Sequence, residues 1–308
     1  MALTALSALA LMAGGSSVRR GRHGAEVQRS IEFLLRLIET PASTAYVPDG
    51  FFHYQDDSDS KMHGQGYASL ALATALGTSD ARLSRRVRDA LVRAVRCMEQ
   101  SQTMTGGYGY EASPNAQHEG SVTVCIAQAL RAARDAGLLV NDRVVQNGLR
   151  YLYNSQVNAP DREDDGGFKY SQTVNKVTYA LTAAAISSFF LFGKYADDPR
   201  RSLERGLRYM MRQLESGRST SENWYHYGQF YAAWAMWQKD GGDWSRASWW
   251  GRWQALVYPD LLRRQLGDGS WDDDGGLGDR FKYGSVLSTA FAVLTLAIPD
   301  EPLPIFQR

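Results

Sequence analysis

Residues 265–271 read Gln-Leu-Gly-Asp-Gly-Ser-Trp, and four related stretches precede them in the chain. Each stretch contains at least one aromatic residue, and all but one include glycine, as expected of a tight loop. The five stretches are residues 49–54, 106–110, 166–170, 224–227 and 268–271. Measured from Gly50 through Gly107, Gly167 and Trp224 to Trp271, successive stretches lie 57, 60, 57 and 47 residues apart. This period predicts a repeated helical hairpin with a loop at each end.

Two kinds of helical segment lie between these loops. Six are rich in alanine and apolar on nearly every side, which is typical of helices buried all round: residues 3–13, 65–76, 121–136, 177–192, 228–238 and 284–298. Five are amphipathic and rich in arginine: residues 24–38, 83–100, 142–156, 198–215 and 246–265. In the second of these, Val87, Leu91, Val95 and Met98 form one apolar stripe.

The alternation of inner and outer segments predicts an all-α fold of antiparallel hairpins. The hairpins could form an open solenoid or a closed ring. A solenoid leaves one face of each inner helix in solvent, whereas these inner segments are apolar throughout. We therefore expect residues 1–308 to form a single α/α toroid domain of the (α/α)6-barrel type, with six inner and about five outer helices. The abrupt start in an apolar segment leaves open that the chain is the C-terminal part of a longer protein.

The composition excludes several classes of protein. A hydrophobic fraction of 44% is enough for a sizeable core and argues against disorder. A formal net charge of +1 gives no electrostatic reason to bind nucleic acid. Cys97 and Cys125 are the only cysteines, too few for a disulfide scaffold or a four-cysteine zinc site. The arginines of the outer segments are typical of a solvated surface, with peripheral contact to an anionic membrane as the alternative.

Residues 265–271 match the Gln-x-x-Asp/Glu-Gly-Ser-Trp repeat of squalene–hopene cyclases and related triterpene cyclases. Further segments resemble bacterial prenyltransferase and squalene oxidase repeat proteins: residues 62–68, 121–125, 227–237 and 303–308. The resemblance covers nearly the whole chain and implies an α/α toroid around a central cavity. The physical reading of the repeat is a structural clamp, in which Trp271 buries its ring and Gln265 and Asp268 bond loop backbone.

The resemblance also implies a position for a catalytic acid. In the cyclases, an Asp-x-Asp-Asp motif at the start of an inner helix protonates the substrate. The matching residues here are 117–120, so Glu119 takes the place of the acid, with His118 beside it, while Gln117 and Gly120 replace the flanking acids. A single Glu beside a His suits ordinary general acid–base chemistry better than protonation of an alkene. The alternative is that Glu119 caps its helix and stabilises the helix dipole.

Three histidines lie near the starts of inner segments, and a toroid would bring those starts onto one rim. His63, His118 and His226 could bind a metal, handle substrate and protons, or make structural hydrogen bonds. We predict no metal ligands and no cofactor. Aromatic residues around the inner segment 228–238 could line an apolar cavity or fill it. The predicted substrate-binding residues are His63, Tyr67, His226, Tyr227, Phe230, Tyr231 and Trp234.

Two classes of function follow from these residues. The first is a squalene cyclase-like or prenyltransferase-like toroid that binds or transforms an isoprenoid-like apolar molecule by general acid catalysis. The second is a non-catalytic toroid that serves as a scaffold or protein-interaction module. The expected partners are accordingly an apolar small molecule, another protein or a membrane surface, and no nucleic acid.

Overall fold

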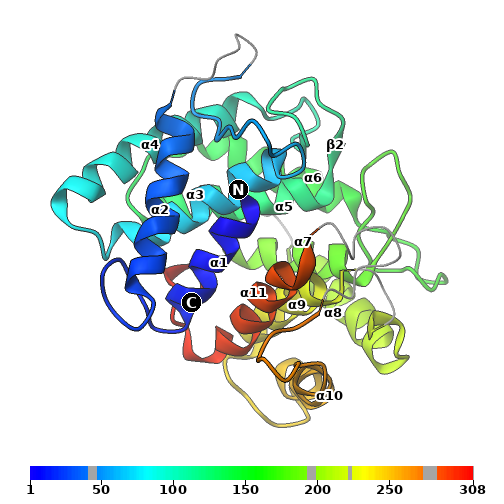
Figure 1. Cartoon of the computed structure of the whole chain (residues 1–308). Coiled ribbons are helices and arrows are strands. Elements are labelled where there is room, and N and C mark those ends of the chain that lie inside the picture. The colour runs from blue at the N-terminus through cyan, green and yellow to red at the C-terminus, as the bar shows by residue number, and fades with distance from the viewer. Residues whose placement is uncertain (41–46, 193–198, 221–223, 273–282, 308) are drawn as a thin grey trace. The chain divides into compact units, whose positions relative to one another are not determined.

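The computed structural model describes residues 1–40, 47–192, 199–220, 224–272 and 283–307 (Figure 1). Eleven α-helices account for most of these described residues, in which the one sheet has two strands of two residues each. The prediction of an all-α fold is confirmed. Contacts divide the chain into two compact units, one of Met1–Tyr151 with Pro302–Gln307 and the other of Leu152–Glu301.

The first unit has a row of three inner helices. They are α1 (Ala2–Ala13), α3 (Lys61–Leu76) and α5 (Gly120–Asp135), with α3 between α1 and α5 (Figure 1). Outside this row, α2 (Gly24–Glu39) packs on α1 and α4 (Ala81–Gln100) packs on α3. Helix α6 (Asp142–Ser155) begins in this unit, and the short 3-10 helix η3 (Pro304–Phe306) packs on α5.

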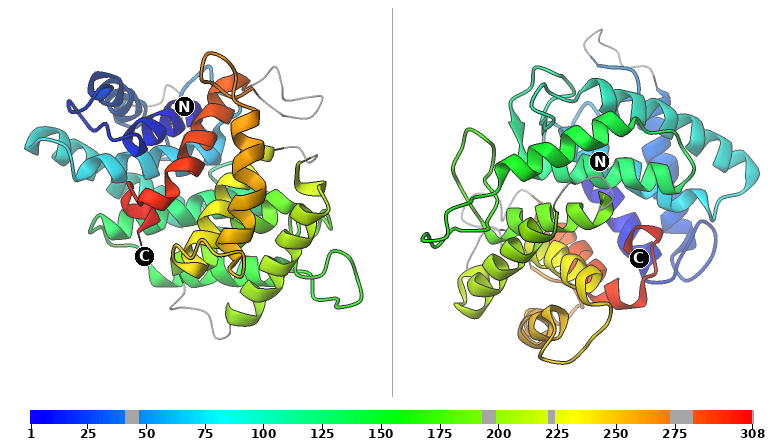
Figure 2. Two further views of the ribbon diagram at one scale, coloured as in Figure 1. Left: turned by 90° about the horizontal axis from the view of Figure 1, so that it is seen from below. Right: turned by 180° about the vertical axis from the view of Figure 1, so that it is seen from behind.

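The second unit repeats this plan. Its inner helices α7 (Tyr179–Phe192), α9 (Tyr225–Asp240) and α11 (Gly284–Ala297) form a row with α9 in the middle. The outer helix α8 (Pro199–Glu215) packs on α7, and α10 (Trp249–Arg263) packs on α9 and α8 (Figure 2). Two 3-10 helices, η1 (Arg218–Thr220) and η2 (Ile298–Asp300), complete the unit.

Burial explains why the two kinds of helix differ in composition. Nearly every residue of α3 is buried, whereas α4 buries one stripe that includes Val87, Leu91 and Met98 and leaves Arg85 and Arg88 exposed. The helical repeat predicted from the sequence is therefore confirmed. Closure of the two rows into one ring concerns the placement of the units and stays a prediction. Among the described helices, none is both long and apolar enough to span a membrane.

Two inner helices begin earlier than the sequence predicted. The stretch 224–227 was expected to be a loop, but Tyr225 already lies in the first turn of α9, and α3 begins four residues before residue 65. Only Trp224, whose φ of 69° is left-handed, belongs to the turn before α9. The reason is packing, because Met62, Tyr225 and His226 are all buried and the helical backbone directs them into the core.

The aromatic loops share one hydrogen-bond arrangement. In three of them, the backbone N–H of the loop aromatic donates to a threonine hydroxyl in the first turns of the next inner helix, at 3.0 Å in each case. The pairs are Tyr108 with Thr123, Phe168 with Thr182, and Trp271 with Thr289. Each aromatic ring is buried. The loop and the following inner helix are thereby joined in the same way in each of these three repeats.

Glycine and glutamine fix the other side of each loop. Gly106 and Gly166 have φ of 88° and 86°, and a Cβ at either position would collide with a backbone carbonyl of the neighbouring outer helix. The side-chain amides of Gln102 and Gln156, which lie four and ten residues before these glycines, donate to the Gly106 and Gly166 carbonyls, each at 3.0 Å. In residues 265–271 the same bond from glutamine to a glycine carbonyl joins Gln265 to Gly269, whose φ is 87°, but within the described residues no backbone of a neighbouring helix lies close to Gly269.

The clamp predicted for residues 265–271 is confirmed. The Trp271 ring is buried, and its indole N–H donates to the Leu261 carbonyl at 2.8 Å. Asp268 accepts from the Ser270 backbone N–H at 3.0 Å, and Gln265 donates to the Gly269 carbonyl at 2.9 Å. These loop residues therefore serve the architecture of the hairpin.

Candidate functional site

Glu119 is the N-cap of α5. It is the second residue of strand β2 (His118–Glu119), which pairs antiparallel with β1 (Tyr108–Gly109). The helix begins directly after this strand. The carboxylate is 1% exposed and accepts from the backbone N–H groups of Ser121 at 2.9 Å and Val122 at 2.6 Å. The Ser121 hydroxyl also donates to it, at 2.7 Å. Glu119 therefore caps α5, as in the structural alternative that the sequence left open.

His63 joins this network from α3. Its Nε2 lies 3.0 Å from the Ser121 hydroxyl and 3.9 Å from a Glu119 carboxylate oxygen. Because the single hydroxyl proton of Ser121 is donated to Glu119, the His63 Nε2 carries a proton and donates to Ser121. Burial lowers the pKa of His63, and the nearby Glu119 carboxylate opposes that shift. The donors thus run from His63 through the Ser121 hydroxyl to the Glu119 carboxylate.

His118 has a different partner from Glu119. Successive side chains of a strand point to opposite faces, and the His118 ring turns to Tyr151 of α6. Its Nδ1 lies 3.0 Å from the Tyr151 hydroxyl, and the two rings meet edge to face with centroids 5.1 Å apart. Burial lowers the pKa of His118. The two residues predicted to be catalytic thus belong to separate hydrogen-bond groups of the first unit.

Tyr67 lies at the close contact of α3 and α5. It is 5% exposed and interacts with the thiol of Cys125, which is buried and also donates to the His63 carbonyl at 3.4 Å. Burial raises the pKa of the Cys125 thiol. At Gly66, a Cβ would overlap Cys125, so glycine at this position lets the two helices approach. Tyr67 thereby fills an interhelical contact.

His226 lies in the second unit, beside a polar group formed by α9 and α10. The Tyr225 hydroxyl donates to Asp260 at 2.8 Å, and the Arg264 guanidinium lies 4.2 Å from the centre of the Tyr225 ring. The rings of Tyr225 and His226 meet edge to face, with centroids 5.1 Å apart. Burial, helped by the charge of Arg264 and opposed by Asp260, lowers the pKa of His226 to about 4. His226 is therefore neutral at pH 7.

The other predicted aromatic residues of α9 pack on one another and on α11. The ring of Tyr227 lies 4.7 Å from Tyr231 and 5.7 Å from Phe291, and Phe230 lies 5.4 Å from Phe291. Phe230 also contacts Trp234, whose ring centre is 6.1 Å away. Phe230, Tyr231 and Trp234 are all buried. Within this unit the aromatic faces are used for packing between helices.

The structure thus brings His63 and Glu119 together through Ser121, and it gathers the α9 aromatics around Phe291. Whether His63, His118 and His226 meet on one rim was left open by the sequence, and it concerns the placement of the two units. No three His, Cys, Asp or Glu side chains gather as a possible metal site within the described part of the chain. The sequence analysis assigned no role to Ser121 or Tyr151, whose partners His63 and His118 lie 58 and 33 residues away in the chain.

A scan of the sequence against protein-family models matches none, and a search of the curated proteins finds no match. The resemblance to the triterpene cyclases therefore depends on the motifs themselves, and the structure shows that one of them, residues 265–271, clamps a helical hairpin.

Proposed function

We propose that this protein is a non-catalytic helical-repeat module, a scaffold or protein-interaction module rather than a cyclase. The observation that carries the proposal is the hydrogen bonding of Glu119. Both carboxylate oxygens accept from groups of the helix that Glu119 caps, two backbone N–H groups and the Ser121 hydroxyl.

Protonation of an alkene requires an acidic hydrogen that points at the substrate. The oxygen lone pairs of Glu119 that would hold such a hydrogen are directed at the start of α5 instead. His118, which stands next to it in the sequence, hydrogen-bonds with Tyr151. Glu119, which the resemblance aligns with the cyclase acid, therefore serves as a helix cap.

The aromatic residues support the same proposal. Rings that stabilise a cationic intermediate must present their faces to an open cavity. Here Tyr227 and Phe230 each contact both Tyr231 and Phe291, at centroid distances between 4.7 and 5.7 Å. Repeat proteins commonly use stacked helical pairs as extended binding surfaces, a role that needs no reactive residue.

The test is incubation of the purified chain with squalene and with geranyl and farnesyl diphosphates, followed by product analysis. Glu119→Gln is measured beside the wild type. We expect no product from either protein. A product formed by the wild type and lost in a folded Glu119→Gln variant would refute the proposal. In parallel, tagged chain recovered from its own cells after chemical cross-linking should carry a partner protein in stoichiometric amount, and recovery of the chain alone would contradict the interaction role.

A further inference from the structure

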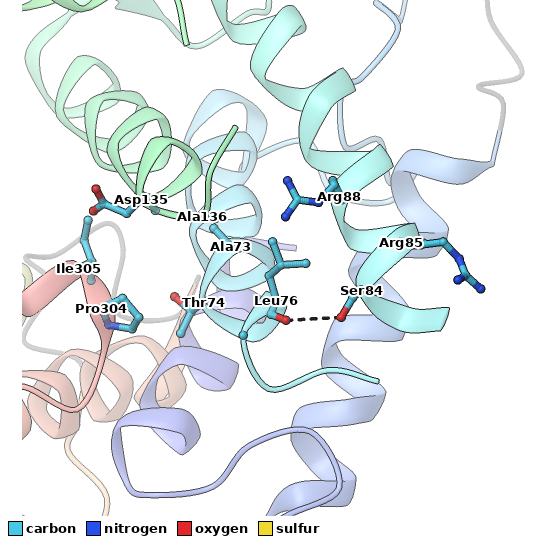
Figure 3. Close-up of a pocket in the computed structure, with 12 residues that line it drawn as sticks. Ala73, Thr74, Leu76, Ser84, Arg85, Arg88, Asp135, Ala136, Pro304 and Ile305 are labelled. Atoms are coloured by element: carbon cyan, nitrogen blue, oxygen red, sulfur yellow. Dashed lines mark hydrogen bonds between the residues drawn. The ribbon is translucent and has the colours of Figure 1, made fainter. Parts of the chain in front are cut away.

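A pocket of about 480 Å³ lies in the first unit, away from Glu119 (Figure 3). It is formed where α3 and α5 end, with the beginning of α4 on one side and η3 on the other. Its volume falls within the range of ligand sites, about 300–1,000 Å³. All of the residues that line it belong to the same unit.

The floor and one side of the pocket are apolar. Ala73 and Leu76 come from α3, Ala132 from α5, and Pro304 and Ile305 from η3. These side chains have no hydrogen-bonding groups, so a ligand portion that lies on them gains most when it is itself apolar.

A positive charge stands at the α4 side of the pocket. Arg88 is exposed, and Figure 3 shows its guanidinium directed toward the space between α4 and α3, whereas Arg85 points away. Within the described residues, no acidic side chain forms an ion pair with Arg88. The one acid of the lining, Asp135, is already paired with Arg131 of its own helix at 2.8 Å. Arg88 therefore places at the rim a positive charge that no acidic side chain of the described residues neutralises.

From these observations we propose that the pocket binds an amphiphile, a molecule with an apolar chain and an anionic head group. The chain lies on Ala73, Ala132 and Ile305, and the head group binds the guanidinium of Arg88. The carbonyl ends of α3 and α5, together with Asp135, disfavour an anion on the opposite side. The head group is therefore placed at α4 and the apolar chain toward η3.

Two head-group chemistries fit a guanidinium equally, since carboxylate and phosphate both accept two parallel N–H bonds. Isothermal titration with dodecanoate, dodecyl phosphate and dodecanol, each below its micelle concentration, separates the head groups from the chain. We expect the two anions to bind and the neutral alcohol to bind at least about tenfold more weakly, because a charge-assisted hydrogen bond is lost. The stronger of the two anions identifies the head group.

Matched variants locate the site. Arg88→Gln should weaken binding of the anions about tenfold and leave the alcohol unchanged. Arg96→Gln removes the same charge from an exposed position of α4 outside the pocket, and it should change affinity by no more than about twofold. Ala136→Trp places an indole at a half-buried lining position, so binding of all three ligands should be lost. Circular dichroism confirms that each variant is folded.

A photoreactive dodecanoate analogue gives a second readout on the wild-type chain, which does not depend on any variant folding. We expect its cross-links on the peptides that carry Ala132 and Ile305. The proposal is refuted if neither anion binds, if the alcohol binds as tightly as the anions, or if Arg88→Gln and Arg96→Gln weaken binding equally. Cross-links confined to the second unit would also overturn it. None of these outcomes depends on whether the protein is a scaffold.

Discussion

Replacement of Glu119 distinguishes a cap from a catalyst. In Glu119→Ala, the N–H groups of Ser121 and Val122 lose acceptors that lie 2.9 and 2.6 Å away, and the Ser121 hydroxyl loses its acceptor as well. Loss of an N-cap costs about 0.5–2 kcal/mol, and a buried donor left without a partner costs about 1–3 kcal/mol. With partial rescue by water, we expect the free energy of unfolding to fall by about 3 kcal/mol.

Conservative variants should follow the order of capping strength. Glu119→Asp keeps a carboxylate of the type preferred at N-caps and should lose no more than about 1 kcal/mol. Glu119→Gln keeps one oxygen acceptor but sets an amide N–H₂ against the remaining backbone donor, so its loss should lie between those of Asp and Ala. Glu111→Ala is the control, because Glu111 is exposed and, among the described residues, its side chain pairs only with Lys61 at the surface, a contact worth at most about 1 kcal/mol.

Urea unfolding followed by circular dichroism measures these differences. Hydrogen exchange of the Ser121 and Val122 amides gives a local readout: both should exchange faster in Glu119→Ala than in Glu119→Asp. The reasoning fails if Glu119→Ala is as stable as Glu111→Ala, or if Asp and Ala at position 119 destabilise equally. A catalytic acid would give the opposite pattern, since its removal usually leaves stability unchanged or higher.

Four further substitutions, one of them a control, test the clamp and the buried histidine. Gly166→Ala should lower the free energy of unfolding by at least about 2 kcal/mol, because φ at Gly166 is 86° and the backbone of α8 blocks a Cβ. Gly267→Ala is its control: no atom of the described residues lies within 4 Å of a Cβ there, so stability should change by no more than about 0.5 kcal/mol. Urea unfolding measures both variants. Trp271→Phe should cost about 1 kcal/mol by the same assay, since the Leu261 carbonyl loses the indole donor. The pKa of His226 is about 4 in the folded chain, whereas the ordinary value is 6.5, so the unfolded chain binds the proton more readily. The free energy of unfolding should therefore fall by up to about 3 kcal/mol as the pH drops from 6.5 to 4. His226→Asn should flatten this dependence in unfolding curves measured across that pH range.

The helices could be predicted because their signal is local and periodic. The stripe of Val87, Leu91 and Met98 follows directly from 3.6 residues per turn, and the buried face of α4 is that stripe. The start of α9 was missed because its first residues, 225–227, belong to a stretch that resembles the aromatic loops, and the start of α3 because its first residues, 61–64, lack the alanine-rich apolar pattern of the rest of the helix. Tyr225 is helical since it packs in the core and bonds Asp260, contacts that depend on a helix 35 residues later in the chain.

The difference between local and long-range contacts also explains what could be predicted of the candidate site. The capping role of Glu119 was available from the sequence as an alternative, because a cap bonds residues two and three positions on. The contact of His63 with Ser121 spans 58 residues and has no local signal. Among the arginines of α4, only the structure shows which one is directed at a pocket, since Ile305 forms one of its walls from the far end of the chain.

In the first unit, residues at the beginning and at the end of the inner helices make different kinds of contact. At the beginning of α5, the side chains of Glu119 and Thr123 bond backbone of the loop or helix, and the Ser121 hydroxyl donates to Glu119. Substitutions there therefore disturb the fold before they disturb binding. Ten residues along α3 from His63, or about 15 Å, the pocket is lined largely by short apolar side chains, with Arg88 at its edge. Residues at this end can vary without breaking a clamp. Binding specificity should therefore change with substitutions at the helix ends near Arg88, and stability with substitutions at the helix starts near Glu119.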